Sequence, residues 1–506
     1  MTLGMSLGVA LVGLEGRLVN VDVDIADGLP GYTLLGLPDT ALTESRDRVR
    51  SALVNSQENW PNRKVTVSLS PAWLPKSGPG FDLPIAIALL SAQQSIPMEH
   101  SESVLYLGEL ALDGQIRAVR GVLPSLIAGY KAGIKSAVVP YANRLEAQLM
   151  VEMTIIPMRN LSELLRWLRT NEREEEQELP LVHDEPQGGD DFSDVAGQER
   201  ARFAAEIAAV GGHHLLLIGP PGAGKTMIAQ RLPSVLPPLS RDEVLEVTAI
   251  HSIAGGLTTR SPLASCAPFV APHHTATRVA MVGGGGHYIR PGACSLAHRG
   301  VLFVDEAPEC GVGVLDSLRQ PLESGSITIA RSIGSVTYPA NFLLVLAANP
   351  CPCGNFSGRG RNCICTSIQV RRYLGKLSGP LMDRIDMRVE VEPLNRVELT
   401  QSNLGESSAT IRSRVIAARA IAAERFKKYP WKLNAEISSR SLRIEFRLEK
   451  EAMNFLHNEL DHEHISARGL HKVMRTSWSI ADLALHPRPT LADTVKAYEM
   501  REGLNV

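Results

Sequence analysis

The chain has 506 residues, of which 44% are hydrophobic, and a formal net charge of −2. This length allows two to four domains with sizeable cores, and the nearly neutral charge excludes a polycation, so any nucleic-acid contact must come from a local basic surface. There is no run of about 18 apolar residues and no basic leader, so we expect neither a membrane span nor a signal peptide. The number of cysteines is odd, which does not suggest a secreted disulfide framework, and we expect a cytoplasmic location.

Residues 1–168 predict an α+β domain. Short apolar strands alternate with helical patterns in this segment. The strands are expected at 19–23, 64–69 and 136–139, and the helices near 45–56 and 82–92. Residues 169–191 are acidic and rich in Glu, Asp, Gln and Gly, which is typical of a solvated linker.

A phosphate-binding loop follows the apolar run 215–218 and opens the next segment, residues 192–393. The loop consists of Gly219, Pro220, Pro221, Gly222, Ala223, Gly224, Lys225 and Thr226. A buried strand that leads into such a glycine-rich turn and then into a helix can surround phosphates with backbone N–H groups. We expect Lys225 to bridge the β- and γ-phosphates and Thr226 to offer its hydroxyl to Mg²⁺, with ATP as the nucleotide.

Two carboxylates end a second buried strand, 301–304. Asp305 is expected to hold the water shell of Mg²⁺, and Glu306 to polarise the attacking water. A glycine-rich turn alone could arise by chance, but a strand ending in Asp-Glu after it favours a nucleoside triphosphatase with an α/β P-loop core.

Three further polar residues are candidates for sensing the γ-phosphate. Asn349 ends the apolar run 342–348 and could orient the water. Arg384 could reach into a neighbouring subunit's site, and Arg468 could touch the bound nucleotide, with Arg475 as the fallback. Each arginine is also compatible with a surface ion pair. Residues 394–506 predict a helical domain, with amphipathic helices at 411–426, 451–460 and 466–485.

Four cysteines form two closely spaced pairs. They are Cys351, Cys353, Cys363 and Cys365. Four thiols could bind one structural Zn²⁺ tetrahedrally, although reduced thiols or a redox pair are alternatives. Arg359 and Arg361, between the pairs, belong to the best local basic patch and are candidate contacts to a DNA backbone, with a solvated loop as the alternative.

The order of these motifs resembles the AAA+ ATPases, with a Walker A loop, a Walker B pair, sensor 1 at Asn349, an arginine finger at Arg384 and sensor 2 at Arg468. The long interval after Thr226 and a predicted β-hairpin at 325–338, with Arg331 at its tip, resemble the branch with a helix-2 insert and a pre-sensor-1 hairpin. That branch includes the magnesium-chelatase motor subunits. The resemblance to it implies a hexameric ring whose hairpins bind the substrate. The helical C-terminal domain would be the lid.

The N-terminal block is similar to the proteolytic domain of Lon. Two stretches carry this similarity, 75–84 and 107–117, and the segment 119–125 continues it. A peptidase of that type needs a serine nucleophile and a lysine base. Gly80 and Leu123 stand at these positions, so the resemblance implies the fold without the peptidase activity.

The full arrangement resembles the ComM/YifB family, which is grouped with the magnesium-chelatase subunits. The resemblance implies a homo-hexameric, ATP-driven translocase that acts on single-stranded or branched DNA, in branch migration during recombination or natural transformation. The alternative is a chelatase-like or protein-remodelling ATPase with a protein partner. A nucleotide-gated scaffold without enzymatic activity is the third hypothesis.

Overall fold

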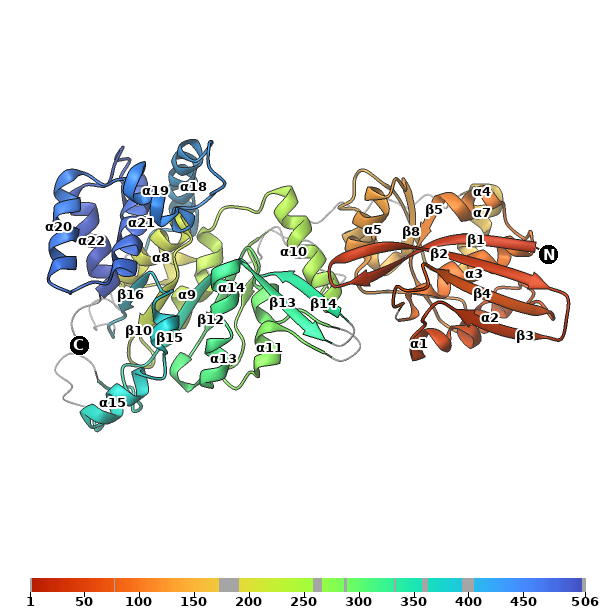
Figure 1. Cartoon of the computed structure of the whole chain (residues 1–506), viewed down its shortest axis with the longest axis horizontal. Coiled ribbons are helices and arrows are strands. Elements are labelled where there is room, and N and C mark those ends of the chain that lie inside the picture. The colour runs from red at the N-terminus through yellow and green to blue at the C-terminus, as the bar shows by residue number, and fades with distance from the viewer. Residues whose placement is uncertain are drawn as a thin grey trace. The chain divides into compact units, whose positions relative to one another are not determined.

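The computed structural model describes residues 2–76, 78–172, 191–257, 266–285, 289–331, 334–356, 363–393 and 405–502. The chain divides into two compact units (Figure 1). The N-terminal unit comprises residues 1–184, 241–264 and 330–338, and the C-terminal unit comprises 185–240, 265–329 and 339–506. The boundaries expected at 168, 191 and 393 remain predictions, and most of the expected linker lies outside the described residues. No helix among the described residues combines the length and the apolar character that a bilayer crossing requires.

A seven-stranded mixed sheet forms the centre of the N-terminal unit, in the order β3-β4-β2-β1-β5-β8-β9. Its strands are β1 (Thr2–Val12), β2 (Glu15–Ala26), β3 (Gly31–Leu35), β4 (Lys64–Ser70), β5 (Val104–Tyr106), β8 (Ser136–Pro140) and β9 (Thr154–Met158). The pairs β1–β2 and β2–β4 are antiparallel, and the others are parallel. A separate ladder joins β6 (Glu109–Leu110) and β7 (Ile116–Arg117). The strands expected at 19–23, 64–69 and 136–139 are confirmed as parts of β2, β4 and β8.

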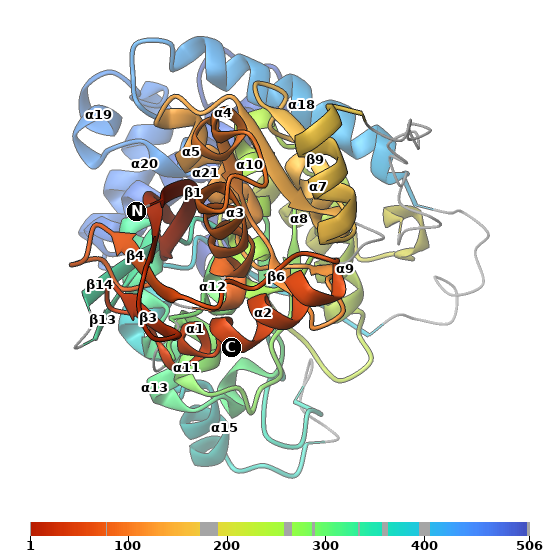
Figure 2. The same cartoon turned by 90° about the vertical axis from the view of Figure 1, so that its right-hand side faces the viewer.

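Helices pack against this sheet (Figures 1 and 2). They are α1 (Thr40–Thr43), α2 (Ser45–Asn55), α3 (Asp82–Ala92), α4 (Met98–Ser103), α5 (Val122–Lys131), α6 (Arg144–Ala147) and α7 (Leu161–Thr170). Consecutive side chains of a strand point to opposite faces. Accordingly, Ala10 of β1 joins a core with α3, whereas Val9 joins a second core with α5. A Cβ on Gly4 would lie 2.2 Å from the Ala88 carbonyl oxygen, so glycine there permits the close approach of α3.

The helix α10 (Arg241–Ala254) follows the P-loop helix in the chain but belongs to the N-terminal unit. It packs on α5, and its Leu245 and Ala249 join the apolar core beside that helix. Its Ser252 hydroxyl donates a buried hydrogen bond to Glu146, with 2.6 Å between the oxygens, and accepts one from the Gly121 N–H at 3.0 Å. Burial raises the pKa of Glu146, although the hydrogen bonds that its carboxylate accepts from Ser252, Asn143 and the Leu123 N–H oppose this change. This helix is therefore an integral part of the N-terminal unit.

A five-stranded parallel sheet forms the centre of the C-terminal unit, in the order β11-β12-β15-β10-β16. Its strands are β10 (Leu215–Ile218), β11 (Phe269–Val270), β12 (Val301–Val304), β15 (Leu343–Ala348) and β16 (Met387–Glu390). The central strands are apolar nearly throughout because helices and loops cover both faces of a parallel sheet. The hairpin expected at 325–338 is confirmed as β13 (Ser326–Arg331) paired with β14 (Gly334–Pro339).

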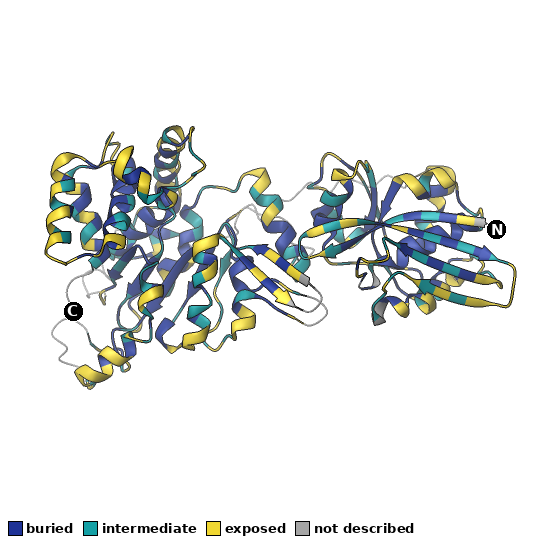
Figure 3. Cartoon of the chain, viewed as in Figure 1, coloured by how far each residue is buried: buried dark blue, intermediate teal, exposed yellow. Residues whose placement is uncertain are grey.

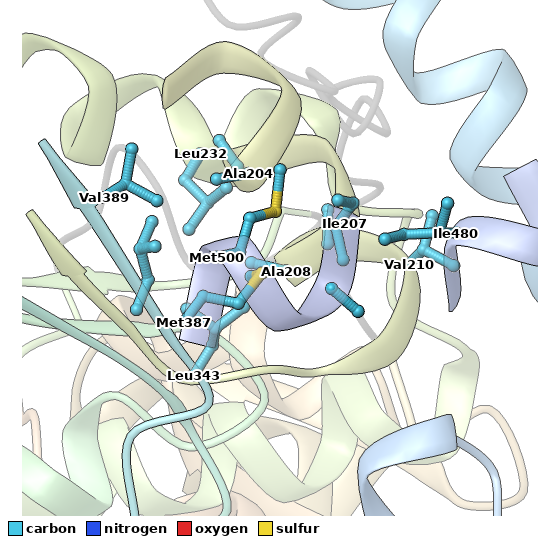
Figure 4. Close-up of a cluster of buried hydrophobic side chains, with 14 of the residues drawn as sticks. Ala204, Ile207, Ala208, Val210, Leu232, Leu343, Met387, Val389, Ile480 and Met500 are labelled. Atoms are coloured by element: carbon cyan, nitrogen blue, oxygen red, sulfur yellow. The ribbon is translucent and has the colours of Figure 1, made fainter. Parts of the chain in front are cut away.

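The long helices of the C-terminal unit, together with α19, share one hydrophobic core with its sheet (Figures 3 and 4). The long ones are α8 (Glu199–Gly211), α9 (Lys225–Val235), α18 (Ser408–Arg425), α20 (Lys450–Asp461), α21 (Ala467–Leu483) and α22 (Leu491–Glu502). The short ones are α11 (Arg278–Val282), α12 (Ala293–Leu296), α13 (Val312–Asp316), α14 (Arg319–Ser324), α15 (Ser367–Leu374), α16 (Gly379–Met382) and α19 (Ser439–Ile444). Figure 4 shows Ile207 of α8, Met387 of β16, Ile480 of α21 and Met500 of α22 in this core. The three helices expected beyond residue 394 are confirmed.

Buried charges join the sheet to the C-terminal helices. Asp386, 4% exposed, pairs with Lys472 of α21 at 2.6 Å, and the same ammonium donates to the Arg384 carbonyl oxygen at 2.8 Å. Burial alone would raise the pKa of Asp386, but Lys472 and the neighbouring histidines outweigh it and lower that pKa. His213 lies fully buried beside this pair, and its Nε2 is 2.7 Å from the Ser479 hydroxyl of α21. Burial lowers the pKa of His213 to about 4, against the opposing charge of Asp386.

Candidate nucleotide-binding site

The candidate residues meet at one edge of the parallel sheet. The P-loop leaves the carboxyl end of β10, the Asp305–Glu306 pair leaves β12, and Asn349 leaves β15. Because β12, β15 and β10 are neighbours and parallel, their carboxyl ends lie side by side. Ligands of open α/β sheets bind at such an edge.

The backbone of the P-loop has the conformation that glycine permits. A Cβ on Gly219 would lie 2.2 Å from the Val391 carbonyl oxygen, which only a glycine avoids. Gly224 has a φ of +96°, in the left-handed region that favours glycine. The helix α9 starts at the next residue, Lys225, so its N–H groups and the positive end of its dipole face the loop. The loop is therefore built to hold an anion such as a phosphate.

Lys225 and Thr226 connect the P-loop to the two neighbouring strand ends. The Lys225 ammonium donates to the Gly219 carbonyl oxygen at 2.6 Å and to Asn349 Oδ1 at 3.2 Å. The Thr226 hydroxyl donates to Asp305 Oδ2 at 2.9 Å. Burial lowers the pKa of Lys225, while the carboxylates of Asp305 and Glu306 oppose that change. The hydroxyl and the carboxylate are oxygen ligands of the kind that Mg²⁺ prefers, and their contact means that one ion could be held by both.

Glu306 has a strained backbone. Its φ of +47° lies in the left-handed region, which costs free energy for a residue with a side chain and is found most often at functional sites. Its carboxylate is half exposed and lies 3.3 Å from Nδ1 of His274. The His274 ring contacts that of His273, with 4.1 Å between the centroids and a tilt of 33°. The carboxylate is therefore accessible to a water and is paired with an imidazole.

The arginines expected to sense the nucleotide are paired elsewhere. The Arg384 guanidinium binds Glu323 of α14 and the Pro380 carbonyl oxygen. Arg468, in the first turn of α21, is largely exposed and lies 3.2 Å from Asp383. Arg475 donates to the Ile437 carbonyl oxygen at 2.8 Å. Among the hydrogen bonds and ion pairs found in the described part of the chain, none of the three arginines contacts the P-loop, so their roles remain predictions.

The four cysteines of the two pairs come together. Their sulfur atoms all lie within 4.8 Å of one another, with Cys351 buried and the other three half-buried. Of the predicted DNA contacts, Arg359 and Arg361 lie outside the described residues. Arg331 is the last residue of β13, and its side chain is outside the description.

Three residues near the site carried no functional role in the sequence prediction. The carboxamide of Gln198 donates to the Ala223 carbonyl oxygen of the P-loop at 3.2 Å. Gly354, in the cysteine segment, lies so close to Pro221 that a Cβ would be 2.6 Å from its Cδ. His274 lies beside Glu306 because of the two-residue strand β11, which is too short to predict from periodicity.

Family models for the magnesium chelatase subunit ChlI match most of the chain. The model described as magnesium chelatase, subunit ChlI, matches residues 191–399, a second ChlI model matches 21–143, and the ChlI C-terminal model matches 405–501. The chain is 48% identical over 502 residues to an uncharacterized protein of Mycobacterium tuberculosis, covering 99% of both. It is 40% identical over 499 residues to YifB of Salmonella typhimurium, covering 98% and 95%. It is 38% identical over 493 residues to the competence protein ComM of Haemophilus influenzae, covering 96% and 94%.

A weaker similarity to a protease covers part of the chain. The Lon protease of Brevibacillus choshinensis is 25% identical over 181 residues, which is 33% of this chain and 23% of that protein. The similarity agrees with the Lon-like pattern of the sequence but covers a minor part of either protein.

Proposed function

This chain belongs to the ComM/YifB family, related to the magnesium chelatase subunit ChlI, and we propose that it is an ATP-hydrolysing motor that acts on DNA. The observation that carries the ATPase proposal is the contact between Thr226 and Asp305, with Lys225 and Asn349 joined beside it. A phosphate cradle, a ligand pair for Mg²⁺ and an accessible carboxylate at one sheet edge are the parts that phosphoryl transfer requires.

Each residue of the nucleotide-binding site has a separate role in ATP hydrolysis. The P-loop N–H groups and Lys225 bind the β- and γ-phosphates, and Thr226 and Asp305 hold the Mg²⁺ that neutralises phosphate charge. Glu306 accepts a proton from the attacking water, and the carboxamide nitrogen of Asn349 holds that water in line. Arg384 stabilises charge in the neighbouring subunit's site, and Arg468 contacts the nucleotide.

The DNA proposal rests on the family and on the hairpin. A homo-hexameric ring of the branch with a helix-2 insert and a pre-sensor-1 hairpin would direct β13–β14 to its substrate. Arg331, Arg359 and Arg361 would contact DNA phosphates, and helicase activity or branch migration would result. The relative from Haemophilus influenzae is described as a competence protein, which fits a role in recombination or transformation. The four cysteines would hold a structural Zn²⁺. We place this activity in the cytoplasm, where thiols stay reduced.

A second candidate is a protein-remodelling or chelatase-like ATPase. The match of three ChlI models, together spanning most of the chain, favours it. In that case the same ATPase site would act on a protein partner.

Steady-state ATP hydrolysis with and without DNA separates the two candidates. The assay uses single-stranded DNA and a four-way junction at two salt concentrations, with Lys225→Ala as the negative control. Stimulation by DNA that weakens at higher salt is expected, because phosphate contacts release counterions. Hydrolysis that is unaffected by every nucleic acid would instead support a protein partner, and hydrolysis equal in Lys225→Ala would reject the site.

A further inference from the structure

We propose that the four-cysteine cluster is a zinc site that supports the P-loop, so that nucleotide binding depends on zinc. The inference rests on the proposed ATPase function, because the P-loop is its nucleotide site. It goes beyond a purely structural zinc in assigning the metal an effect on that site.

The sulfur atoms are spaced as tetrahedral zinc ligands. A Zn–S bond of about 2.3 Å places the sulfurs of a tetrahedral site about 3.8 Å apart. The Sγ of Cys351 is 3.4 Å from that of Cys353 and 3.6 Å from that of Cys363, and the latter two are 3.7 Å apart. A disulfide would require about 2.05 Å. Three sulfurs thus have tetrahedral spacing and the Cys365 sulfur lies within 4.8 Å of all three, so the arrangement fits four thiolates around one ion and does not fit bonded pairs.

The remaining ligand, Cys365, ends the site and begins a helix. Its N–H donates to Cys363 Sγ at 3.4 Å, a contact that helps to orient that sulfur. Thr366 then caps α15 through the Gln369 N–H. In this helix Tyr373 is buried, and its phenol lies near the backbone N–H of Asn349, which opposes the burial that raises the pKa of Tyr373 to about 12. Tyr373 therefore lies beside Asn349, the residue that follows β15 and precedes the cysteine segment.

Two contacts connect this segment to the P-loop. Asn349, two residues before the first cysteine, accepts a hydrogen bond from Lys225. Gly354, one residue after the second cysteine, is buried and packs on the ring of Pro221. The glycine has a φ of +77°, and its N–H donates to the Cys351 carbonyl oxygen at 3.0 Å, so the turn that carries it is formed by the metal ligands themselves.

These contacts imply that metal binding fixes the P-loop from one side. Zinc would hold the turn at 351–354 against Pro221 and hold Asn349 near Lys225. Without the ion, four neighbouring sulfurs lose the bonds that keep them in place, and the turn keeps the hydrogen bond from the Gly354 N–H to the Cys351 carbonyl oxygen. Because a binding loop that must be ordered before it can bind gives a weaker complex, nucleotide affinity should fall.

The test measures zinc and nucleotide affinity on the full chain. Zinc is measured by elemental analysis, and the dissociation constant of a fluorescent ATP analogue by titration. Wild type should contain about one zinc per chain, and Cys351→Ser should lose it. That variant should bind the analogue about tenfold more weakly, within the range of coupling between residues in contact. The exposed Cys266 gives the matched control, because Cys266→Ser removes a thiol outside the cluster and should keep both zinc and affinity.

A second variant separates the metal from the contact. Pro221→Ala keeps all four thiols and leaves the turn at 351–354 unaltered but removes the ring that Gly354 contacts, so it should retain zinc and still lose affinity. Circular dichroism checks that each variant is folded. Cys351→Ser that keeps its zinc would overturn the metal site. Loss of zinc with unchanged affinity would overturn the link to the P-loop and leave the ATPase proposal intact. A wild-type protein that binds zinc but no nucleotide would instead reject the ATPase proposal.

Discussion

Lowering the pH from 7 to 5 should destabilise the C-terminal unit through His213. This histidine is fully buried between the sheet and α21, and its Nε2 lies 2.7 Å from the Ser479 hydroxyl. Its Nδ1 is buried and has no hydrogen-bond partner among the described residues. A second ring proton would therefore be placed where none of the described residues offers an acceptor, close to the ammonium of Lys472 and the guanidinium of Arg475.

The magnitude follows from the pKa. Burial lowers the pKa of His213 from 6.5 to about 4, so between these values the unfolded chain binds a proton that the folded chain does not. Stability therefore falls as the pH falls through this window. His213 alone should lower the free energy of unfolding by about 2 kcal/mol between pH 7 and pH 5, and by about 3 kcal/mol in total at lower pH. Burial also lowers the pKa of His214 to about 4, and this histidine adds a loss that wild type and a His213 variant share.

Hydrogen exchange at the amides of β10 and α21 provides the assay. Their free energy of opening, corrected for the intrinsic exchange rate, is compared at pH 7 and pH 5. His213→Gln retains a polar group at the position of Nε2 and does not titrate. Between pH 7 and pH 5 its free energy of opening should therefore fall by about 2 kcal/mol less than that of wild type. The exposed His457 of α20 supplies the control, since His457→Gln should behave as wild type. An equal loss in wild type and His213→Gln would refute the reasoning.

Three other predictions concern the site and its support. Glu306→Gln should bind the ATP analogue with wild-type affinity but lose nearly all hydrolysis, whereas Lys225→Ala should lose binding itself; retained turnover in either variant contradicts its role. Arg384→Ala should abolish turnover, and mixing it with Lys225→Ala subunits should restore part of it if the arginine acts in a neighbour's site; turnover that stays at zero counts against that role. Lys472→Met leaves Asp386 buried without its cation and should lower the free energy of unfolding by about 3–5 kcal/mol. Asp386→Asn in the same chain should recover part of this loss, as measured by urea unfolding, and no recovery would argue against the ion pair.

Most of the nucleotide site could be predicted from the sequence because its parts are local. A strand followed by a glycine-rich turn and a helix specifies the P-loop without knowledge of the rest of the chain. Asp305 and Asn349 could be recognised in the same way, as polar residues at the ends of apolar strands. Since all these strands are parallel neighbours, their ends had to meet, and the structure brings Thr226 to Asp305 and Lys225 to Asn349.

The contacts that could not be predicted depend on tertiary structure. Glu323 binds Arg384 from a helix 61 residues earlier in the chain, and no pattern in either segment indicates this pair. His274 reaches Glu306 only because β11 lies beside β12 in the sheet. The strand β1 was also missed, because its apolar residues follow both faces of a sheet rather than one. The packing of α10 on α5 was also missed, because nothing in the sequence of α10 indicates which of the two units the helix joins.

The packing of α10 on α5 has a consequence for synthesis on the ribosome. The first 172 residues contain the whole seven-stranded sheet, but without α10 the buried carboxylate of Glu146 lacks the Ser252 hydroxyl and part of the α5 core is uncovered. The cover of the α5 core can therefore be completed only after residue 254 has left the exit tunnel, by which time the P-loop has also been made. At about 5–20 residues per second, this delay lasts roughly 4–16 s, during which an apolar surface is open to chaperones.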